Sequence, residues 1–400
     1  MNGRIPLLED LGELRGKRVL VRLDLNVPLA DGPDGRRVVA DDFRIRAALP
    51  TLTWLLNKGA KVTVCTHLGR PGGKVDPGCD LAPIRARLQE LAPGVAVREN
   101  LRFSPGEEAN DPAFVDELVK DQDCYVNDAF GVSHRAHASI VGPPSRLPSA
   151  AGRLLAREVD VLTGLLESPA RPFVVVVGGA KVKDKIGVLR SLAKMADALL
   201  VGGGMAFTFL HALGHETGAS IVDRTHLEDC ADLLRSEGHL LLPVDTVAIA
   251  PGCKLAIEDD SRGRAETSTE RLRETAVFGT DVPGGWRGVD IGPATAVLFS
   301  EVIASAKTVL WNGPMGVFED DRFCGGTKAI AEAVANCPGD TVVGGGDSAS
   351  ALAHLGLSDR IDHMSTGGGA SLELLEHGDL PGLQALRNAP NARHLYEEPL

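Results

Sequence analysis

The sequence predicts an α/β protein of two domains, each built on a mainly parallel sheet flanked by helices. Short β-branched runs alternate with segments of helical period along the whole chain, which is typical of parallel βα units. The length of 400 residues exceeds the usual size of one domain and allows two hydrophobic cores. Hydrophobic residues make up 44% of the chain and charged residues 24%, as in ordinary globular proteins.

Short apolar runs are the predicted strands. In the first half they lie at 18–23, 61–65, 95–98 and 124–126, and in the second at 173–177, 198–201, 240–242, 308–311 and 340–343. Each run is too short for a typical helix and is bounded by turn residues, which favours buried strands.

The segment 151–168 predicts a helix that links two domains. Its apolar residues fall on one helical face, and the prolines that follow it cannot continue a helix. A stretch rich in proline and glycine at 141–150 precedes it. We therefore expect a first domain, a linker helix, a second domain and a C-terminal segment at 1–150, 151–170, 171–364 and 365–400.

Charge and cysteine content exclude several classes of protein. The chain has 42 Lys and Arg against 54 Asp and Glu, a net charge of −12, which argues against nucleic-acid or anionic-membrane partners. No apolar run approaches the ~20 residues of a spanning helix, and the N-terminus has no signal core, so we expect a cytoplasmic protein. The seven scattered cysteines form no CxxC pair, so neither a disulfide framework nor a zinc site is predicted.

The loops after the predicted strands differ between the two halves. Ligands of parallel sheets bind outside the carboxyl ends of the strands, so these loops are where a site is expected. First-half loops are basic and polar, as in RLDLNVP, THLGRP, ENLRF and VNDAFGVSHRAH, whereas second-half loops are glycine-rich, as in VGGAKVKDK, VGGGMAF, WNGPMGVFE and VGGGDSA. The first half suits a small anionic molecule, and the second suits phosphates bound by backbone amides.

Basic side chains gather in or beside the first-half loops: Arg22, Arg44, Arg70, Arg102, Arg135, His67, His134 and His137. Any one of them is explained as a surface charge, but their joint placement predicts an acidic ligand held by guanidinium groups. Asp24 and Asn26 among them are candidates to accept from substrate hydroxyls, or Asp24 orients an arginine. His67 is equally well explained as a structural histidine.

A single glycine cluster after a strand is explained by a tight turn, because such turns need residues that tolerate positive φ. The run GGGDSA at 344–349 also fits the weak dinucleotide fingerprint G-x-G-x-x-A. Asp347 within it would repel a bare pyrophosphate but suits a nucleotide chelated to Mg²⁺. Several such clusters on successive strands favour a nucleotide site.

Lys181 and Lys185 lie four residues apart at the start of a helix predicted over 182–195. They would share one face near the positive end of the helix dipole, where cations are unfavourable unless an anion binds. A solvated charged face is the alternative. The run STGGGAS at 365–371 likewise places backbone amides at the start of a helix.

Two rival functions use the same features. A nicotinamide-dependent oxidoreductase would use 344–349 and needs an acidic residue about 20 positions later; Asp362 lies 18 residues after Gly344. A non-catalytic two-domain protein that clamps an anionic metabolite would bind ligand without turnover.

Ten ordered motifs between about residue 16 and about residue 382 resemble those of the phosphoglycerate kinase family. They are RLDLNVP, DDFRIRAALPT, THLGRP, ENLRF, YVNDAFGVSHRAH, RPFVVVVGGAKVKDKI, VGGGMAFTF, WNGPMGVFE, GGGDSA and STGGGASLELLEHG. The resemblance implies two Rossmann-like domains that face across a cleft with a hinge, with 365–400 returning to the first domain. It also implies a monomer that transfers a phosphoryl group reversibly from 1,3-bisphosphoglycerate to Mg-ADP, giving 3-phosphoglycerate and Mg-ATP, directly and in line after domain closure.

The resemblance carries site residues over by position. It implies an acid-substrate site of Arg22, Asp24, Leu25, Asn26, Arg44, His67, Leu68, Gly69, Arg70, Arg102 and Arg135. It implies nucleotide contacts at Lys185, Gly288, Glu319, Gly345, Gly346, Asp347 and Ser348, with Asp347 also linking to Mg²⁺. Catalytic stabilisation would come from Arg44, Lys181, Gly367 and Gly368. Ser348 replaces the usual threonine and keeps its hydroxyl, and the loop at 29–37 and the tail at 383–400 lie outside the motifs.

Overall fold

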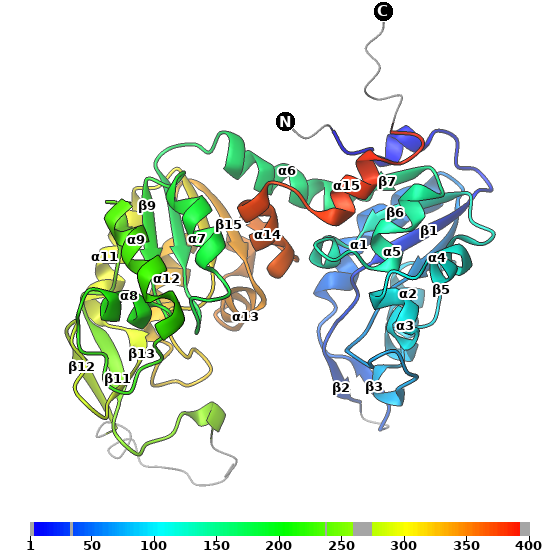
Figure 1. Ribbon diagram of the computed structural model, residues 1–400. Helices are drawn as coiled ribbons and strands as arrows, with labels where there is room; N and C mark the ends of the chain where they lie inside the picture. Colours follow the sequence, from blue (N-terminus) through cyan, green and yellow to red (C-terminus); the bar gives the residue numbers. More distant parts are fainter. Residues whose placement is uncertain (1–3, 33–34, 237, 259–273, 393–400) are drawn as a thin grey trace, which may run out of the picture. The chain divides into compact units, whose positions relative to one another are not determined.

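The computed structural model describes the chain except residues 1–3, 33–34, 237, 259–273 and 393–400. The chain forms two compact units, unit 1 with Met1–Thr163 and Gly369–Leu400, and unit 2 with Gly164–Gly368 (Figure 1). Each unit contains a parallel sheet with helices around it, so the predicted α/β class is confirmed.

Unit 1 is built on a five-stranded sheet in the order β5-β4-β1-β6-β7, with every pair parallel. The strands are β1 (Arg18–Leu23), β4 (Lys61–Cys65), β5 (Ala96–Val97), β6 (Cys124–Asp128) and β7 (Ser149–Ala151). Every residue of β1 after Arg18 is buried because β1 lies between two neighbours and is covered on both faces. A separate antiparallel hairpin pairs β2 (Leu29–Asp31) with β3 (Arg37–Val39).

Besides the predicted linker helix, unit 1 contains seven α-helices in its described residues. They are α1 (Phe43–Asn57), α2 (Ala82–Leu91), α3 (Pro105–Glu108), α4 (Pro112–Val119), α5 (Ala138–Val141), α14 (Gly369–His377) and α15 (Pro381–Arg387). Leu52 of α1 and Ile84 of α2 join Val21 of β1 in one core cluster. Short 3-10 turns connect the elements of unit 1 at Leu8–Leu11, Pro77–Cys79, Leu101–Phe103, Phe130–Val132 and Pro143–Ser145.

The predicted linker helix is α6 (Arg153–Glu167), and the boundary between the units falls within it. The Arg153 amide donates to Thr51 Oγ1 at 2.7 Å, and the Leu155 amide donates to Asp128 Oδ1 at 3.0 Å. Gly152 leaves room for the carboxylate, because a Cβ there would lie 2.2 Å from Asp128 Oδ1. The buried Asp128 thus acts like a capping side chain for α6.

Unit 2 is built on a six-stranded parallel sheet in the order β10-β9-β8-β14-β15-β16. Its strands are β8 (Phe173–Val177), β9 (Ala198–Val201), β10 (Leu240–Leu241), β14 (Thr308–Asn312), β15 (Asp340–Gly344) and β16 (His363–Met364). Its helices are α7 (Ile186–Ala193), α8 (Ala206–Ala212), α9 (Leu227–Ser236), α11 (Pro293–Ala304), α12 (Gly325–Ala335) and α13 (Gly346–His354), with 3-10 turns at Arg224–His226, Ala256–Glu258 and Ser358–Arg360. Trp311 of β14 is fully buried with Phe299 and Ile330 in its core.

A second sheet in unit 2 was not expected from the sequence. It is antiparallel, in the order β12-β11-β13, and its strands are β11 (Thr246–Ile249), β12 (Thr275–Phe278) and β13 (Arg287–Ile291). Gly288 and Asp290 interrupt β13, and β11 and β12 are runs of only four residues, so none of the three shows the longer apolar pattern of the central strands. No helix in the described part of either unit is long and apolar enough to cross a membrane.

The predicted helix over 182–195 is shorter in the structure. Its helical part, α7, begins after Lys185, and Lys181 lies outside it. The prediction that Lys181 and Lys185 share one helix face is therefore wrong. The cause is tertiary: Lys185 Nζ donates to Gly178 O at 2.7 Å, while its amide donates to Val182 O in a turn.

We expect Asp128→Asn to remove a pH dependence of stability. Burial raises the pKa of Asp128 to about 6, against hydrogen bonds from Thr51 and Leu155 that lower it. The folded state holds this proton more tightly than the unfolded state, so the stabilisation is complete below about pH 4 and is lost as pH rises through the folded pKa. A rise from 3.8 to about 6 corresponds to about 3 kcal/mol.

Urea unfolding of wild type and Asp128→Asn between pH 4 and 7 checks this. The variant should gain stability relative to wild type as pH rises. A difference that stays constant over this range would contradict the pKa of Asp128.

Candidate functional site

Arg22 and His67 form the buried centre of the basic residues in unit 1. Arg22 lies near the carboxyl end of β1 and is 1% exposed, and His67 follows β4 and is 2% exposed. Arg22 Nε donates to Ser139 Oγ at 2.9 Å, and one terminal nitrogen of Arg22 lies 3.2 Å from His67 Nδ1. Burial, with the nearby charges of Arg22 and Arg102, holds the pKa of His67 well below its ordinary value.

Arg44 lies in the first turn of α1 and forms an ion pair with Asp24. The side chain of Arg44 is 34% exposed and that of Asp24 is 10% exposed. Asp24 thus orients an arginine, one of the two roles that its position allowed.

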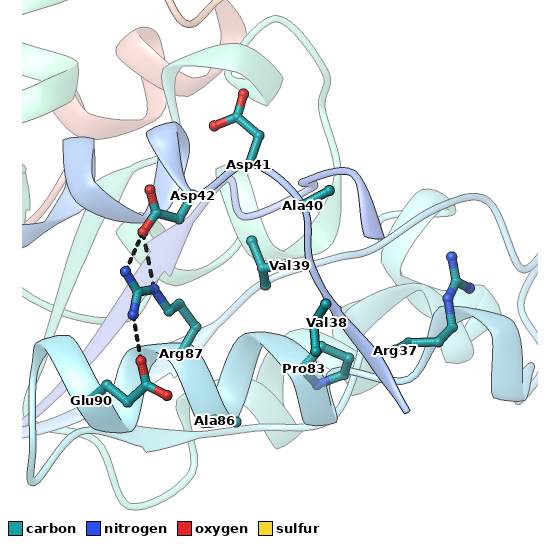
Figure 2. Close-up of a pocket in the computed structure, with 10 residues that line it drawn as sticks. All are labelled: Arg37, Val38, Val39, Ala40, Asp41, Asp42, Pro83, Ala86, Arg87 and Glu90. Atoms are coloured by element: carbon teal, nitrogen blue, oxygen red, sulfur yellow. Dashed lines mark hydrogen bonds and ion pairs between the residues drawn. The ribbon is translucent and has the colours of Figure 1, made fainter. Parts of the chain in front are cut away.

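The first turn of α1 is fixed to α2 by a bridge of side chains (Figure 2). Arg87 donates to Asp42 Oδ2 from Nε at 3.0 Å and from a terminal nitrogen at 2.7 Å, and it also pairs with Glu90. These groups line a pocket of about 540 Å³ between β3 and α2. The predicted site residues do not line this pocket.

The loops after β1 and β4 are joined by polar contacts. The Gly69 amide donates to Asn26 Oδ1 at 2.9 Å, and the Leu25 amide donates to Thr66 Oγ1 at 3.0 Å. Arg102 donates to Gly69 O at 2.7 Å. The structure therefore brings these predicted residues together at the carboxyl ends of neighbouring strands.

Leu68 and the remaining basic residues complete the predicted set in unit 1. Leu68 is buried, and its carbonyl accepts from Asn100 Nδ2 at 2.9 Å. Arg70 is exposed. Arg135 Nε donates to His134 Nε2 at 3.2 Å, and burial lowers the pKa of both His134 and His137.

Lys185 is the centre of the candidate site in unit 2. Its ammonium group donates to Gly178 O at 2.7 Å, to Asn312 Oδ1 at 2.8 Å and to Asn312 O at 3.1 Å. Burial lowers the pKa of Lys185 to about 8, although Asp347 and Asp184 act to raise it. Gly313 permits this approach, because a Cβ there would lie 2.7 Å from Lys185 Nζ.

The turn from β15 into α13 holds the predicted glycine loop. Gly345 has a φ of 92° and precedes the first residue of α13, Gly346. Asp347 is exposed in the first turn of α13. Ser348 points inward, and its hydroxyl accepts from the Gly313 amide at 2.7 Å.

In the part of unit 2 that the structure describes, the remaining predicted residues form no hydrogen bond with Lys185 or with the turn from β15 into α13. Lys181 and Glu319 are exposed in loops. Gly288 is a packing glycine, because a Cβ there would lie 2.1 Å from Phe207 Cζ. The Gly367 amide donates to Ser365 Oγ at 3.2 Å, so this amide already has a partner, and Gly368 has a φ of 41°.

Two polar residues at these sites were missed by the sequence analysis. Asn312 supplies two acceptors to Lys185, and its place at the end of a predicted strand was a usable signal. Glu107 is fully buried and accepts from the amide and hydroxyl of Ser139. Glu107 follows no predicted strand, so the rule that ligands bind at strand ends gave no indication of it.

Known proteins resemble the chain over nearly its full length. The model of the phosphoglycerate kinase family matches residues 8–98 and 92–378. Phosphoglycerate kinase of Rubrobacter xylanophilus is 48% identical over 398 residues, which cover 94% of this chain and 96% of that protein. That of Roseiflexus castenholzii is 48% identical over 404 residues, covering 94% of this chain and 97% of that protein.

The solved structures that resemble the chain are also phosphoglycerate kinases. The structure of phosphoglycerate kinase from Coxiella burnetii has a TM-score of 0.81 and 34% identity, and covers 96% of this chain and 99% of its own. The enzyme from Pyrococcus horikoshii has a TM-score of 0.77 and 28% identity, and covers 97% and 100%. Because the family model, the relatives and the fold all agree, the chain belongs to the phosphoglycerate kinase family.

Proposed function

We propose that the chain transfers a phosphoryl group reversibly from 1,3-bisphosphoglycerate to Mg-ADP, giving 3-phosphoglycerate and Mg-ATP. The observation that carries this proposal is the pair of cations at strand ends, the buried Arg22 in unit 1 and the half-buried Lys185 in unit 2, in a chain of this family. Each lies where parallel sheets bind ligands.

The acid substrate binds at the arginines of unit 1. Guanidinium groups match the planar oxygens of carboxylates and phosphates, and Arg44 is already oriented by Asp24. Asn26 Oδ1 accepts from the Gly69 amide, which orients the side chain, and its amide nitrogen can donate to the substrate.

The nucleotide binds at the glycine loops of unit 2. The half-buried Lys185 contacts its phosphates, together with the turn at Gly345 and Gly346. Asp347 fits a nucleotide-bound Mg²⁺, because its carboxylate is exposed beside that turn and Mg²⁺ is commonly held by one or two carboxylates plus substrate phosphates. Bound there, Mg²⁺ would neutralise phosphate charge.

Direct transfer requires positioning and charge neutralisation, with no covalent enzyme intermediate. Arg44 and Lys181 stabilise the phosphoryl group in transfer, with backbone amides at Gly367 and Gly368. Because the Gly367 amide donates to Ser365 in the structure, it must exchange this partner to take part.

The two sites belong to different units, whereas reacting atoms must approach to about 3–3.5 Å. We therefore infer that the units close on binding, with α6 and the segment at 365–369 as hinges. Closure would also exclude water from the acyl phosphate.

A coupled assay with 3-phosphoglycerate and Mg-ATP, following formation of the acyl phosphate, tests the function. The clamp alternative predicts binding without turnover, and the oxidoreductase alternative predicts NAD(H) binding in a fluorescence titration. Absence of turnover in the folded protein would overturn the proposal.

Arg44→Ala should lower kcat by about 10²–10³-fold, because it removes one preorganised charge that stabilises the transition state. Folding should be nearly unchanged, since the side chain is partly exposed. Arg85→Ala, at an exposed position of α2, is the control and should retain full activity. Unchanged turnover in folded Arg44→Ala would refute the role.

Asp347→Asn should weaken binding of Mg-nucleotide far more than binding of metal-free nucleotide. The carboxylate favours the polyphosphate only through the cation and repels it otherwise. Calorimetry with and without Mg²⁺ measures both affinities, with the exposed Asp359→Asn as the charge-matched control. Equal losses would mean that Asp347 only shapes the turn.

The radius of gyration should fall most when both sites are filled. Small-angle scattering would compare the unliganded protein with protein holding 3-phosphoglycerate, a non-hydrolysable Mg-nucleotide, or both. Either ligand alone contacts only one unit, so it should lower the radius of gyration less than both ligands together. If the doubly liganded and unliganded proteins scatter identically, closure is wrong.

A further inference from the structure

A carboxylate lies fully buried behind the arginines of unit 1. Glu107, from the last turn of α3, has no exposed surface. Its Oε2 accepts from the Ser139 amide at 2.9 Å, and its Oε1 accepts from the Ser139 hydroxyl at 2.6 Å. A carboxylate removed from water is tolerated only when it is hydrogen-bonded and paired with positive charge.

The Ser139 hydroxyl connects this carboxylate to Arg22. A hydroxyl has one proton, and an ionised carboxylate can only accept, so that proton points to Glu107. The same oxygen must then accept from Arg22 Nε, 2.9 Å away. The hydrogen bonds therefore run in one direction, from Arg22 through Ser139 to Glu107.

The other end of Arg22 determines the state of His67. A guanidinium group has no acceptor and stays protonated. His67 Nδ1 lies 3.2 Å from a terminal nitrogen of Arg22 and can accept from it only with a lone pair, which corresponds to a neutral ring with its proton on Nε2. Asp24 Oδ1 is 3.9 Å from His67 Nδ1, beyond hydrogen-bond distance. The charged and titratable groups around His67 are Arg22, Asp24, Arg44, Arg102 and His137.

We propose that Glu107, acting through Ser139 and Arg22, is a positioning residue that fixes His67 as a neutral imidazole protonated on Nε2, a hydrogen-bond donor for the acid substrate. The use of this donor rests on the proposed function, whereas the tautomer does not. A neutral donor keeps its proton across the range where an ordinary histidine changes charge, so its contribution to substrate binding does not vary with pH there.

Glu107→Gln breaks this chain of hydrogen bonds. Glutamine has one acceptor oxygen for the two Ser139 donors, and its NH₂ group opposes one of them. Where the glutamine NH₂ group faces the Ser139 oxygen, the hydroxyl proton loses its acceptor and the contact that holds Arg22 Nε–H at this oxygen is weakened. Ser139→Ala removes the same link and leaves Glu107 in place.

Nitrogen-15 NMR of the histidine rings in the unliganded full-length protein is the first measurement. His67 should show only the Nε2-protonated tautomer between about pH 5.5 and 8 in wild type, and mixed tautomers in Glu107→Gln and Ser139→Ala. A wild-type His67 that is cationic or protonated on Nδ1 overturns the proposal. The proposal is also overturned if neither variant changes the tautomer of His67.

Steady-state kinetics is the second measurement. Both variants should raise the KM for 3-phosphoglycerate about tenfold, while the KM for Mg-ATP stays unchanged. A KM that does not respond, although the tautomer changes, overturns the use of His67 by the substrate. If wild type shows no kinase activity, the proposed function fails, and NMR still decides the tautomer.

Controls separate positioning from general damage. Glu117→Gln removes the same charge from an exposed site of α4 and should alter neither signature nor KM. Glu107→Asp keeps an acceptor-only side chain and should restore part of the wild-type tautomer. If Glu107→Gln does not fold, Ser139→Ala carries both measurements.

Discussion

Both candidate sites depend on one constraint, the shielding of a cation from water at the carboxyl end of a parallel strand. A cation shielded from water needs hydrogen-bond acceptors from the protein, because the water that would solvate it is excluded. Arg22 meets this with Ser139 Oγ, Leu23 O and His67 Nδ1. Lys185 meets it with one carbonyl oxygen of Gly178 and two oxygens of Asn312.

The same constraint accounts for local features that sequence period does not predict. α7 begins after Lys185, whose side chain reaches back to Gly178 and Asn312. Gly313 has a φ of +98°, and a Cβ there would lie 2.4 Å from Gly178 O and 2.7 Å from Lys185 Nζ. In unit 1, Glu107 of α3 is fully buried and accepts from Ser139, which in turn accepts from Arg22. Most of these polar contacts join residues distant in sequence, so a periodic pattern does not reveal them.

The sequence predicts those elements whose pattern is local, and it misses those whose role depends on packing between distant segments. β1, β4, β8 and β9 have the predicted ends because their β-branched runs are buried on both faces. The short strands β11, β12 and β13 were missed for different reasons: β12 is only half-buried, Gly288 and Asp290 interrupt β13, and β11 has only four residues. Arg22 and His67 were found as strand-end residues, whereas Glu107 acquires its role only by packing against α5, which local sequence does not encode.

The two cations differ in how their charge is balanced. Arg22 is linked through Ser139 to a buried carboxylate, so its charge is compensated in the absence of a ligand. Lys185 is hydrogen-bonded by neutral oxygens, while Asp347 and Asp184 act on it only through space, and burial lowers its pKa to about 8. An anion that binds beside Lys185 would therefore supply the compensating charge that its hydrogen bonds lack, and would stabilise the ammonium form. Under the proposed function, unit 1 would thus bind its ligand with a cation that is already compensated, whereas in unit 2 the phosphate would complete the environment of the cation.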